Sequence, residues 1–362
     1  MTLLRPTLTH LEVNGCMASP TASLSISKWL RLLRNLPILQ KLHLYDAISS
    51  TSNDSARIPS SAIELPQLRR IALRQTRGHT TSTLCAHLLA HLSYPITAET
   101  QLLVSQPALN FEAYAGVVSI PSNRINTHKL ASSHRLPLYT HLSLISHDAY
   151  GFGGQIEFTL TSSMRSDQTS PGPLSISLLL KRDSFRGPIW GVDVNRSTDE
   201  ALCYLAATPL AADVTHLSLN PCPRPARDSS GSVAEYYRTW LYLYATGLRL
   251  QSLTLSPIHE HLQIHAFLNA AQRSLDVKTA FFPELRTLTM RGLDPRCLVD
   301  GLAVPGSLEW NLVRAFQERR KRGDGPTCLK LEDGFSKEMD QIRLLKASDE
   351  GEPMIDFLEG VY

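Results

Sequence analysis

A histidine-rich segment beginning at His259 has the residue types and spacing that zinc chemistry uses. His259 is followed by Glu260, and His261 and His265 stand four residues apart in a stretch with helical periodicity. Zinc proteases hold their metal with the pattern H-E-x-x-H on a helix, which here requires a histidine where Gln263 stands. No third ligand follows at a suitable spacing. We therefore predict surface or partly buried histidines and no metal site.

Other catalytic patterns are also missing from the sequence. There is no G-x-S-x-G elbow that would expose a nucleophilic serine, and no G-x-x-x-x-G-K-[ST] loop that would hold phosphates. The glycine-rich segment 151–154 lacks the flanking strand and helix that a dinucleotide site needs, so we interpret it as a turn. We predict a protein that is not an enzyme and takes no cofactor.

A third set of residues, polar and basic, lies between leucines in the N-terminal part of the chain. In the segments 8–14, 39–45 and 68–74, the pattern L-x-x-L-x-L predicts strands whose leucines (Ile and Val included) point to one side. The residues between them must point to the other side, because successive side chains of a strand alternate. The predicted partner-binding residues on that side are His10, Glu12, Lys41, His43, Tyr45, Arg70 and Arg74.

The basic members of this set indicate what it could bind. Arginine offers a planar fork of N–H donors to a carboxylate or a phosphate group. Arg70 and Arg74, with Lys41 and Tyr45, therefore predict a patch for an acidic or phosphorylated protein partner. The alternative is an ordinary solvated strand face. The corresponding positions of later segments carry mostly hydroxyl groups, so the predicted patch is confined to the first three strands.

A repeated phrase, L-P-x-L-x-x-L-x-L, must position these residues. It recurs at 36–44, 65–73 and 282–290, the last with Phe and Met in place of two leucines. Shorter forms appear between these and beyond them, at intervals of about 29 to 41 residues, which is the range of repeat architectures. Two longer gaps each contain one weaker strand candidate, at 101–105 and 174–180. We predict roughly ten units whose strands stack in parallel, since one such strand cannot bury its apolar face alone.

Helical periodicity fills the segments between the strands. The first of them places Ile26, Trp29, Leu30, Leu33 and Leu36 on one face, with basic residues facing away. The predicted helices are 26–36, 81–92, 198–207, 233–245, 261–271 and 308–322. Strand, loop, helix and loop in each unit predict an irregular α/β leucine-rich-repeat solenoid. Such a horseshoe has a concave parallel sheet and outer helices.

We expect one array over residues 1–362. The repeat spacing resumes in phase after the proline-rich segment 220–232, which favours a single array over two domains. Four segments are polar or show no recognisable repeat pattern, and we interpret them as loops or small insertions within the array. They lie near 46–61, 116–136, 161–173 and 220–232.

Composition limits the classes of partner. The net charge is +3, from 36 Lys and Arg against 33 Asp and Glu, which is too balanced to indicate nucleic acid or a membrane surface. The six cysteines are scattered and form no C-x-x-C pair, as expected for reduced thiols. No segment approaches the 18 or so apolar residues of a membrane span. We expect a cytoplasmic or nuclear protein with no nucleic-acid or membrane partner.

The repeats resemble a known family. The segments 8–13, 29–37 and 63–71 are similar to the C-terminal repeat regions of the F-box/leucine-rich-repeat proteins of mushroom-forming fungi. Near the C-terminus, the helix-patterned segment 312–323 followed by 329–333 resembles the family's helix, basic turn and closing strand. The resemblance covers nearly the whole chain. It implies an array that recognises the substrate of a cullin-based ubiquitin ligase.

The chain departs from this family at its start. Family members carry an F-box upstream of the repeats, which docks on the ligase adaptor, whereas the first repeat here begins by Leu8. The resemblance therefore implies the substrate-recognition region without the F-box, and an adaptor partner only where an F-box precedes it. Two alternatives remain: a free-standing leucine-rich-repeat scaffold or inhibitor, and a GTPase-activating repeat protein of the kind that acts on the Ran GTPase.

Overall fold

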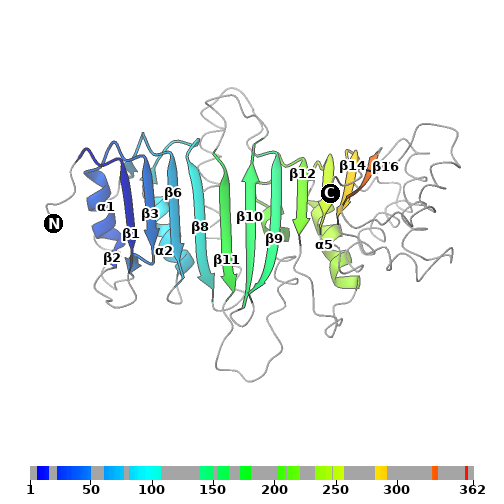
Figure 1. Cartoon of the computed structure of the whole chain (residues 1–362), viewed down its shortest axis with the longest axis horizontal. Helices are drawn as coiled ribbons and strands as arrows, with labels where there is room; N and C mark the ends of the chain where they lie inside the picture. The colour runs from blue at the N-terminus through cyan, green and yellow to red at the C-terminus, as the bar shows by residue number, and fades with distance from the viewer. Residues whose placement is uncertain are drawn as a thin grey trace, which may run out of the picture. The chain divides into compact units, whose positions relative to one another are not determined.

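The computed structural model of the chain describes the greater part of the repeat strands and several of the helices. The described residues are 6–15, 23–49, 61–76, 81–106, 139–149, 153–162, 172–180, 202–208, 210–220, 233–246, 248–256, 282–291, 328–332 and 355–357. They form an α/β architecture with a large, mostly parallel sheet and few helices. Figure 1 labels most of these strands.

The chain divides into two compact units. Unit 1 comprises residues 1–140, 146–197 and 208–210, and unit 2 comprises 141–145, 198–207 and 211–362. Each unit contains its own set of adjacent strands and its own helices. The expectation of one continuous array concerns how the units are joined, and it stays a prediction.

Unit 1 contains six neighbouring strands, five of them parallel. The parallel strands are β1 (His10–Asn14), β3 (Lys41–Tyr45), β6 (Arg70–Gln75), β8 (Glu99–Gln106) and β11 (Leu174–Leu180), in that spatial order. The sixth, β10 (Gly153–Thr161), pairs with β11 in the antiparallel direction. The predicted strands at 8–13, 39–44 and 68–73 are thus confirmed as parallel neighbours.

The prediction that the strands all stack in parallel was wrong beyond β8. There β11 lies beside β8 and pairs with it in parallel, whereas the earlier strand β10 pairs with the far side of β11 in the antiparallel direction. The strand β10 was missed, although Ile156, Phe158 and Leu160 alternate with polar residues and are buried. These three face Leu178, Ile176 and Leu174 in register, so apolar matching favours the antiparallel pair.

Unit 2 contains parallel strands with the same alternation. They are the first five residues of β9 (His141–Ala149), then β12 (His216–Asn220), β13 (Ser252–Leu255), β14 (Thr287–Arg291), β15 (Cys328–Glu332) and β16 (Ile355–Phe357). Each pairs with the next in parallel. Here the strands follow chain order, as the repeat spacing predicted.

Rows of apolar side chains run across the parallel strands and form the core. In unit 1, Leu11, Leu42 and Ile71 occupy one register position on three adjacent strands, and all three are buried. In unit 2, Leu217, Leu253 and Leu288 do the same. This stacking gives each strand the neighbours that it needs to remove its leucines from water.

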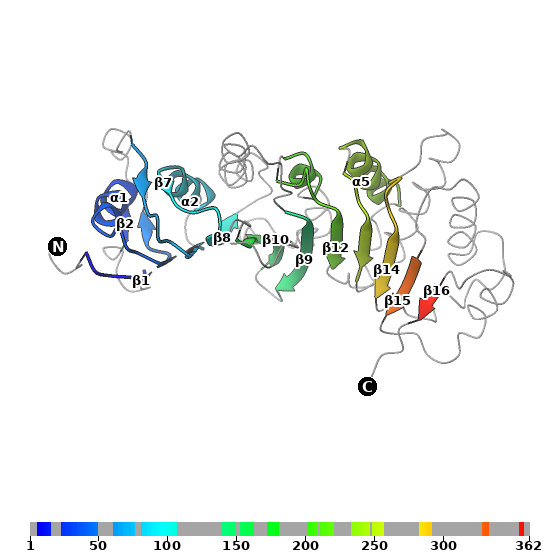
Figure 2. The ribbon, with the colours of Figure 1, turned by 90° about the horizontal axis from the view of Figure 1, so that it is seen from above.

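Helices cover one face of each unit's sheet. Figure 2 shows α1 (Ile26–Arg34) and α2 (Thr81–Ala90) on the same face in unit 1, and α5 (Val233–Ala245) on one face in unit 2. The bounds of α5 are those of the predicted segment 233–245, whereas α1 and α2 begin where predicted and end two residues before the predicted ends of 26–36 and 81–92. In the predicted helix 198–207, residues 202–206 are helical. The predicted helices at 261–271 and 308–322 lie outside the described residues.

The apolar face of α1 is buried as its periodicity predicted. Trp29, Leu30 and Leu33 are almost completely enclosed, while the basic residues of the opposite face are exposed. Short parallel pairs support this layer of unit 1. They are β2 (Leu24–Ser25) with β4 (Ile48–Ser49), and β5 (Ile63–Glu64) with β7 (Leu92–Ser93).

A hydrogen-bonded turn after β3 ties the sheet of unit 1 to its helix layer. Asp46 has a positive φ of 48°, and its carboxylate accepts bonds from the Thr76 backbone N–H (2.6 Å) and hydroxyl (2.9 Å). The Trp29 indole N–H donates to the Ala47 carbonyl at 3.0 Å. The Gln75 side-chain amide donates to the Ile48 carbonyl, also at 3.0 Å. Buried polar groups thus fix how α1 lies against the ends of β3 and β6.

The segments predicted to be irregular are only partly described. Within 46–61, residues 48 and 49 form β4, so the prediction of a loop from residue 46 was wrong at this point. Within 161–173, the described residues are 161 and 162 at the end of β10 and 172 and 173, which precede β11. The segment 116–136 and nearly all of 220–232 lie outside the described residues.

The core row predicts a large cost for removing one leucine. Leu42 is fully buried between β1 and β6, so Leu42→Ala should lower the free energy of unfolding by about 2–5 kcal/mol. Urea denaturation followed by circular dichroism measures this change. Leu241→Ala on α5 is the matched control, because Leu241 is 37% exposed and should cost well under half as much. Equal costs would contradict the assigned core.

Candidate functional site

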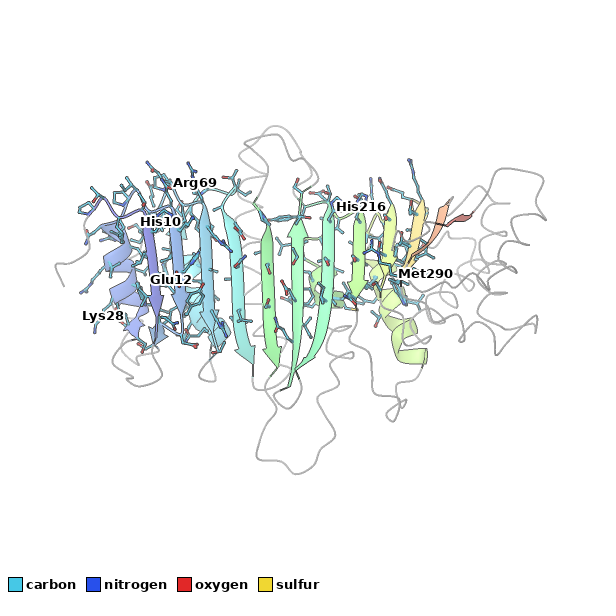
Figure 3. The ribbon with its side chains drawn as sticks, viewed as in Figure 1. His10, Glu12, Lys28, Arg69, His216 and Met290 are labelled. Atoms are coloured by element: carbon cyan, nitrogen blue, oxygen red, sulfur yellow. The ribbon has the colours of Figure 1, made fainter. Side chains whose placement is uncertain are left out.

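The face of the unit 1 sheet that lies opposite α1 and α2 carries the predicted binding residues. We call this face, over β1, β3, β6 and β8, the polar face of unit 1. Its first row contains one residue from each strand at the same register position, near the strand starts; His10 of this row is labelled in Figure 3. That row is His10, Lys41, Arg70 and Glu99.

Two further rows complete the polar face of unit 1. The second row is Glu12, His43, Ala72 and Gln101, and the third is Asn14, Tyr45, Arg74 and Leu103. All seven residues predicted from the alternation therefore lie on this one face of three adjacent strands. Whether they bind a partner stays a prediction.

Arg70 is engaged by an acidic residue that sequence reasoning did not single out. Its Nε lies 3.3 Å from Oε2 of Glu99, and the Gln101 amide donates to the other Glu99 oxygen at 2.7 Å. The Nε–H of Arg70 does not reach hydrogen-bond geometry, so the contact is an ion pair without a directional bond. Glu99 was missed because the weaker strand candidate was placed at 101–105, and β8 begins two residues earlier.

His43 sits between an acidic and an aromatic neighbour. Its Nδ1 lies 3.8 Å from Oε2 of Glu12, and its ring centroid lies 6.1 Å from that of Tyr45 with the planes tilted by 54°. Its Nε2 is buried without a hydrogen-bond partner. His43 therefore contributes to the packing of this face more than to an exposed charge, and its side chain is only 18% exposed.

Lys41 and Arg74 differ from Arg70 in having no acidic partner. Both side chains are exposed, and neither forms an ion pair with another residue in the part of the chain that the structure describes. Arg69, which sequence reasoning did not select, is a further exposed cation just before β6 (Figure 3). The charge available to a partner on β3 and β6 is therefore that of Lys41 and Arg74, not that of all three predicted cations.

In unit 2, the first two rows of the corresponding face carry no Lys, Arg, Asp or Glu on β9, β12, β13 and β14. Its first row is His141, His216, Ser252 and Thr287, and the next contains Ser143, Ser218, Thr254 and Thr289. The rings of His141 and His216 stack at 4.2 Å with a 17° angle between their planes. The His216 Nδ1 and the Thr215 hydroxyl share a hydrogen bond of 2.8 Å. Burial, and then the neighbouring His216, lower the pKa of His141.

Two kinds of reactive group can be assessed among the described residues, a buried thiol and clusters of metal-binding side chains. Burial, and then the charge of Asp46, raise the pKa of the Cys85 thiol to about 12, so this thiol is a poor nucleophile. Across the described ranges, no group of three or more His, Cys, Asp or Glu side chains could hold a metal ion. The predicted histidine pair at 261 and 265 lies outside those ranges. None of the described helices combines the length and apolar character needed to cross a membrane.

Comparison with known proteins adds no relative to this picture. No protein-family model matches the chain, and no curated protein sequence is significantly similar to it.

The two arginines of the polar face should respond differently to charge reversal. Arg70→Glu places a carboxylate beside Glu99 and removes a partly exposed ion pair, so it should lower the free energy of unfolding by about 1 kcal/mol. Arg74→Glu changes an exposed side chain without a partner and should stay within about 0.5 kcal/mol of wild type. Urea denaturation of both variants measures the difference. Equal effects would contradict the Arg70–Glu99 pair.

The stacked histidines predict a pH dependence. Because the folded state lowers the pKa of His141, the unfolded state binds more protons as the pH falls through the ordinary histidine value of about 6.5. The stability that neutral His141 contributes is thus present above this pH and is lost below it, until the lowered folded-state value is reached. Thermal unfolding measures this effect. The decrease in Tm from pH 7.5 to pH 5.5 should be smaller for His141→Gln than for wild type.

A control separates this effect from other histidines. His91 also has a lowered pKa, from burial first and His87 second, so wild type will retain some pH dependence in any variant. His10→Gln alters an exposed histidine outside the stack and should leave the decrease unchanged. If the Tm of His141→Gln decreased as much as that of wild type, the stacked histidines would not be the source of the pH dependence.

Proposed function

We propose that this chain is a non-enzymatic protein-binding array of irregular leucine-rich repeats, with its parallel sheet lining the concave side of a horseshoe. The polar face of unit 1 is the binding surface, and the partner is a protein with an acidic surface. The stacked leucine rows and the alternating polar rows support this proposal, because solenoids present extended sheet faces to their partners.

One observation carries the proposal: Lys41 and Arg74 are exposed on neighbouring strands and lack an acidic partner among the described residues. Their backbones are fixed by the core rows beneath them, so little conformational entropy of the chain is lost on binding. A partner that brings carboxylates to this face would form charge-assisted contacts that the folded chain does not already make. Elsewhere on this face, Glu99 and Glu12 already accompany Arg70 and His43.

The resemblance to fungal F-box proteins extends the proposal to a biological role. Under it, the chain is the substrate-recognition region of a cullin-based ubiquitin ligase in the cytoplasm or nucleus, and the captured protein is the substrate. The repeat phrases at 8–13, 29–37 and 63–71 support this role. The ligase adaptor becomes a partner where an F-box precedes the repeats.

Capture of partners from cell extract tests the surface. Immobilised wild-type chain should retain at least one protein that the double variant Lys41→Glu/Arg74→Glu retains about tenfold less, because two exposed contacts become repulsive. Quantitative mass spectrometry of the retained proteins measures the ratio. Circular dichroism must show that the variant is folded.

The matched control is Lys28→Glu/Arg34→Glu on the exposed side of α1, which changes the net charge by the same amount on the opposite face. It should retain the partner as wild type does. Equal loss in both variants would indicate a general charge effect and contradict the proposed surface. Ubiquitylation of the retained protein that depends on the chain separates the ligase role from a free-standing scaffold.

A further inference from the structure

Lys41 and Arg74, the cations of the polar face that have no acidic partner among the described residues, are spaced to bind a particular kind of acidic segment. Resting on the proposed function, we propose that this face binds an extended peptide segment of the partner lying along β3 and β6. The segment presents two carboxylates spaced four residues apart, one to Lys41 and the other to Arg74.

The register fixes the distance between the two cations. Lys41 is paired with Arg70, and Arg74 lies four residues further along β6, opposite Tyr45. Four residues of strand span about 13 Å, and one strand-to-strand step adds about 4.8 Å sideways, so the two Cα atoms are about 14 Å apart. Two side chains separated by four residues in an extended peptide have the same spacing and lie on the same side of it.

This separation argues against a single phosphate group as the ligand. A phosphate is bound most strongly where two or more cations converge on its oxygens. Lys41 and Arg74 would have to lie flat along the sheet to approach one another, because strand side chains stand roughly perpendicular to it. Arg70 is closer to Lys41, but Glu99 already holds it. Two separate carboxylates therefore fit the charges better than one phosphate.

Acidic residues on the outer strands restrict the direction of the segment. Glu12 lies on β1, on one side of β3, and Glu99 lies on β8, on the other side of β6. An acidic segment that crossed the strands along the first two rows would approach one of these carboxylates. One that follows β3 and β6 stays between them, so like-charge repulsion favours the path along the strands.

The middle of this path is low and uncharged. Ala72 lies in the second row, between the row of Lys41 and the row of Arg74. It has the smallest side chain of the second row, whose other members are Glu12, His43 and Gln101. Tyr45 is half-buried beside Arg74 and offers an aromatic ring at the end of the path. Ala72 is itself only 6% exposed, so a peptide on this path would lie over the side chains that flank Ala72 in the row while its acidic side chains reach the two cations.

Synthetic peptides test the spacing directly. The probe is a fluorescein-labelled nine-residue peptide of Ser and Thr with Glu at its third and seventh positions. The comparison peptide has the same composition with Glu at its third and fifth positions. Fluorescence anisotropy with the full chain should give a Kd about threefold lower for the first peptide, as expected for one additional exposed ion pair.

Charge exchange tests the pairing. The variant Lys41→Glu/Arg74→Glu should bind the first peptide about tenfold more weakly, and a peptide with Lys at the third and seventh positions should recover that loss. The α1 variant Lys28→Glu/Arg34→Glu should bind as wild type does. Equal Kd values for the two Glu spacings, or no recovery by the Lys peptide, would overturn the proposal.

A third peptide separates the inference from the proposed function. It carries one phosphoserine at its fifth position and no Glu, and it should bind more weakly than the peptide with Glu four residues apart. Tighter binding of the phosphopeptide would overturn the two-carboxylate inference while leaving a binding surface intact. The proposed function itself would instead be overturned if the variants Lys41→Glu/Arg74→Glu and Lys28→Glu/Arg34→Glu both lost capture of the partner from cell extract to the same extent.

Discussion

The structure depends on the fact that a single strand with leucine on one side cannot remove that side from water. Leu42 is buried because Leu11 and Ile71 flank it in register on the neighbouring strands, and each of those depends on Leu42 in turn. The apolar rows therefore stabilise neighbours and not isolated elements. The same rows fix the spacing of every residue on the opposite face.

This constraint sets the geometry of the polar face from the buried side of the strands, and contacts such as the Arg70–Glu99 pair add to it. Lys41 and Arg74 are held in position by the burial of Leu42, Leu44 and Leu73 on the other side of the same strands. The turn around Asp46 adds a second fixed point, because its bonds to Thr76 join the ends of β3 and β6. Under the proposed function, a surface whose strands are fixed in this way would favour binding by preorganisation.

The two units use the same scaffold for different surfaces. In unit 1 the polar face carries separated charges, and Lys41 and Arg74 have no acidic partner among the described residues. In unit 2 the first two rows of β9, β12, β13 and β14 carry hydroxyl groups and a stack of two histidines, in which burial lowers the pKa of His141. The difference arises entirely from the residues between the leucines, since the buried rows are alike. Specificity can therefore vary along such a scaffold without changing its core.

The sequence by itself determined the local elements and the side of each strand that faces outward. Period-two leucines placed His10, Lys41 and Arg70 on one face, and helical periodicity placed Trp29 in the core, because both patterns depend only on backbone geometry. The tertiary structure decided which strands are neighbours. It placed β11 beside β8, inserted β10 in the antiparallel direction, and brought Glu99 to Arg70. Such pairings join residues far apart in the chain, and local periodicity carries no information about them.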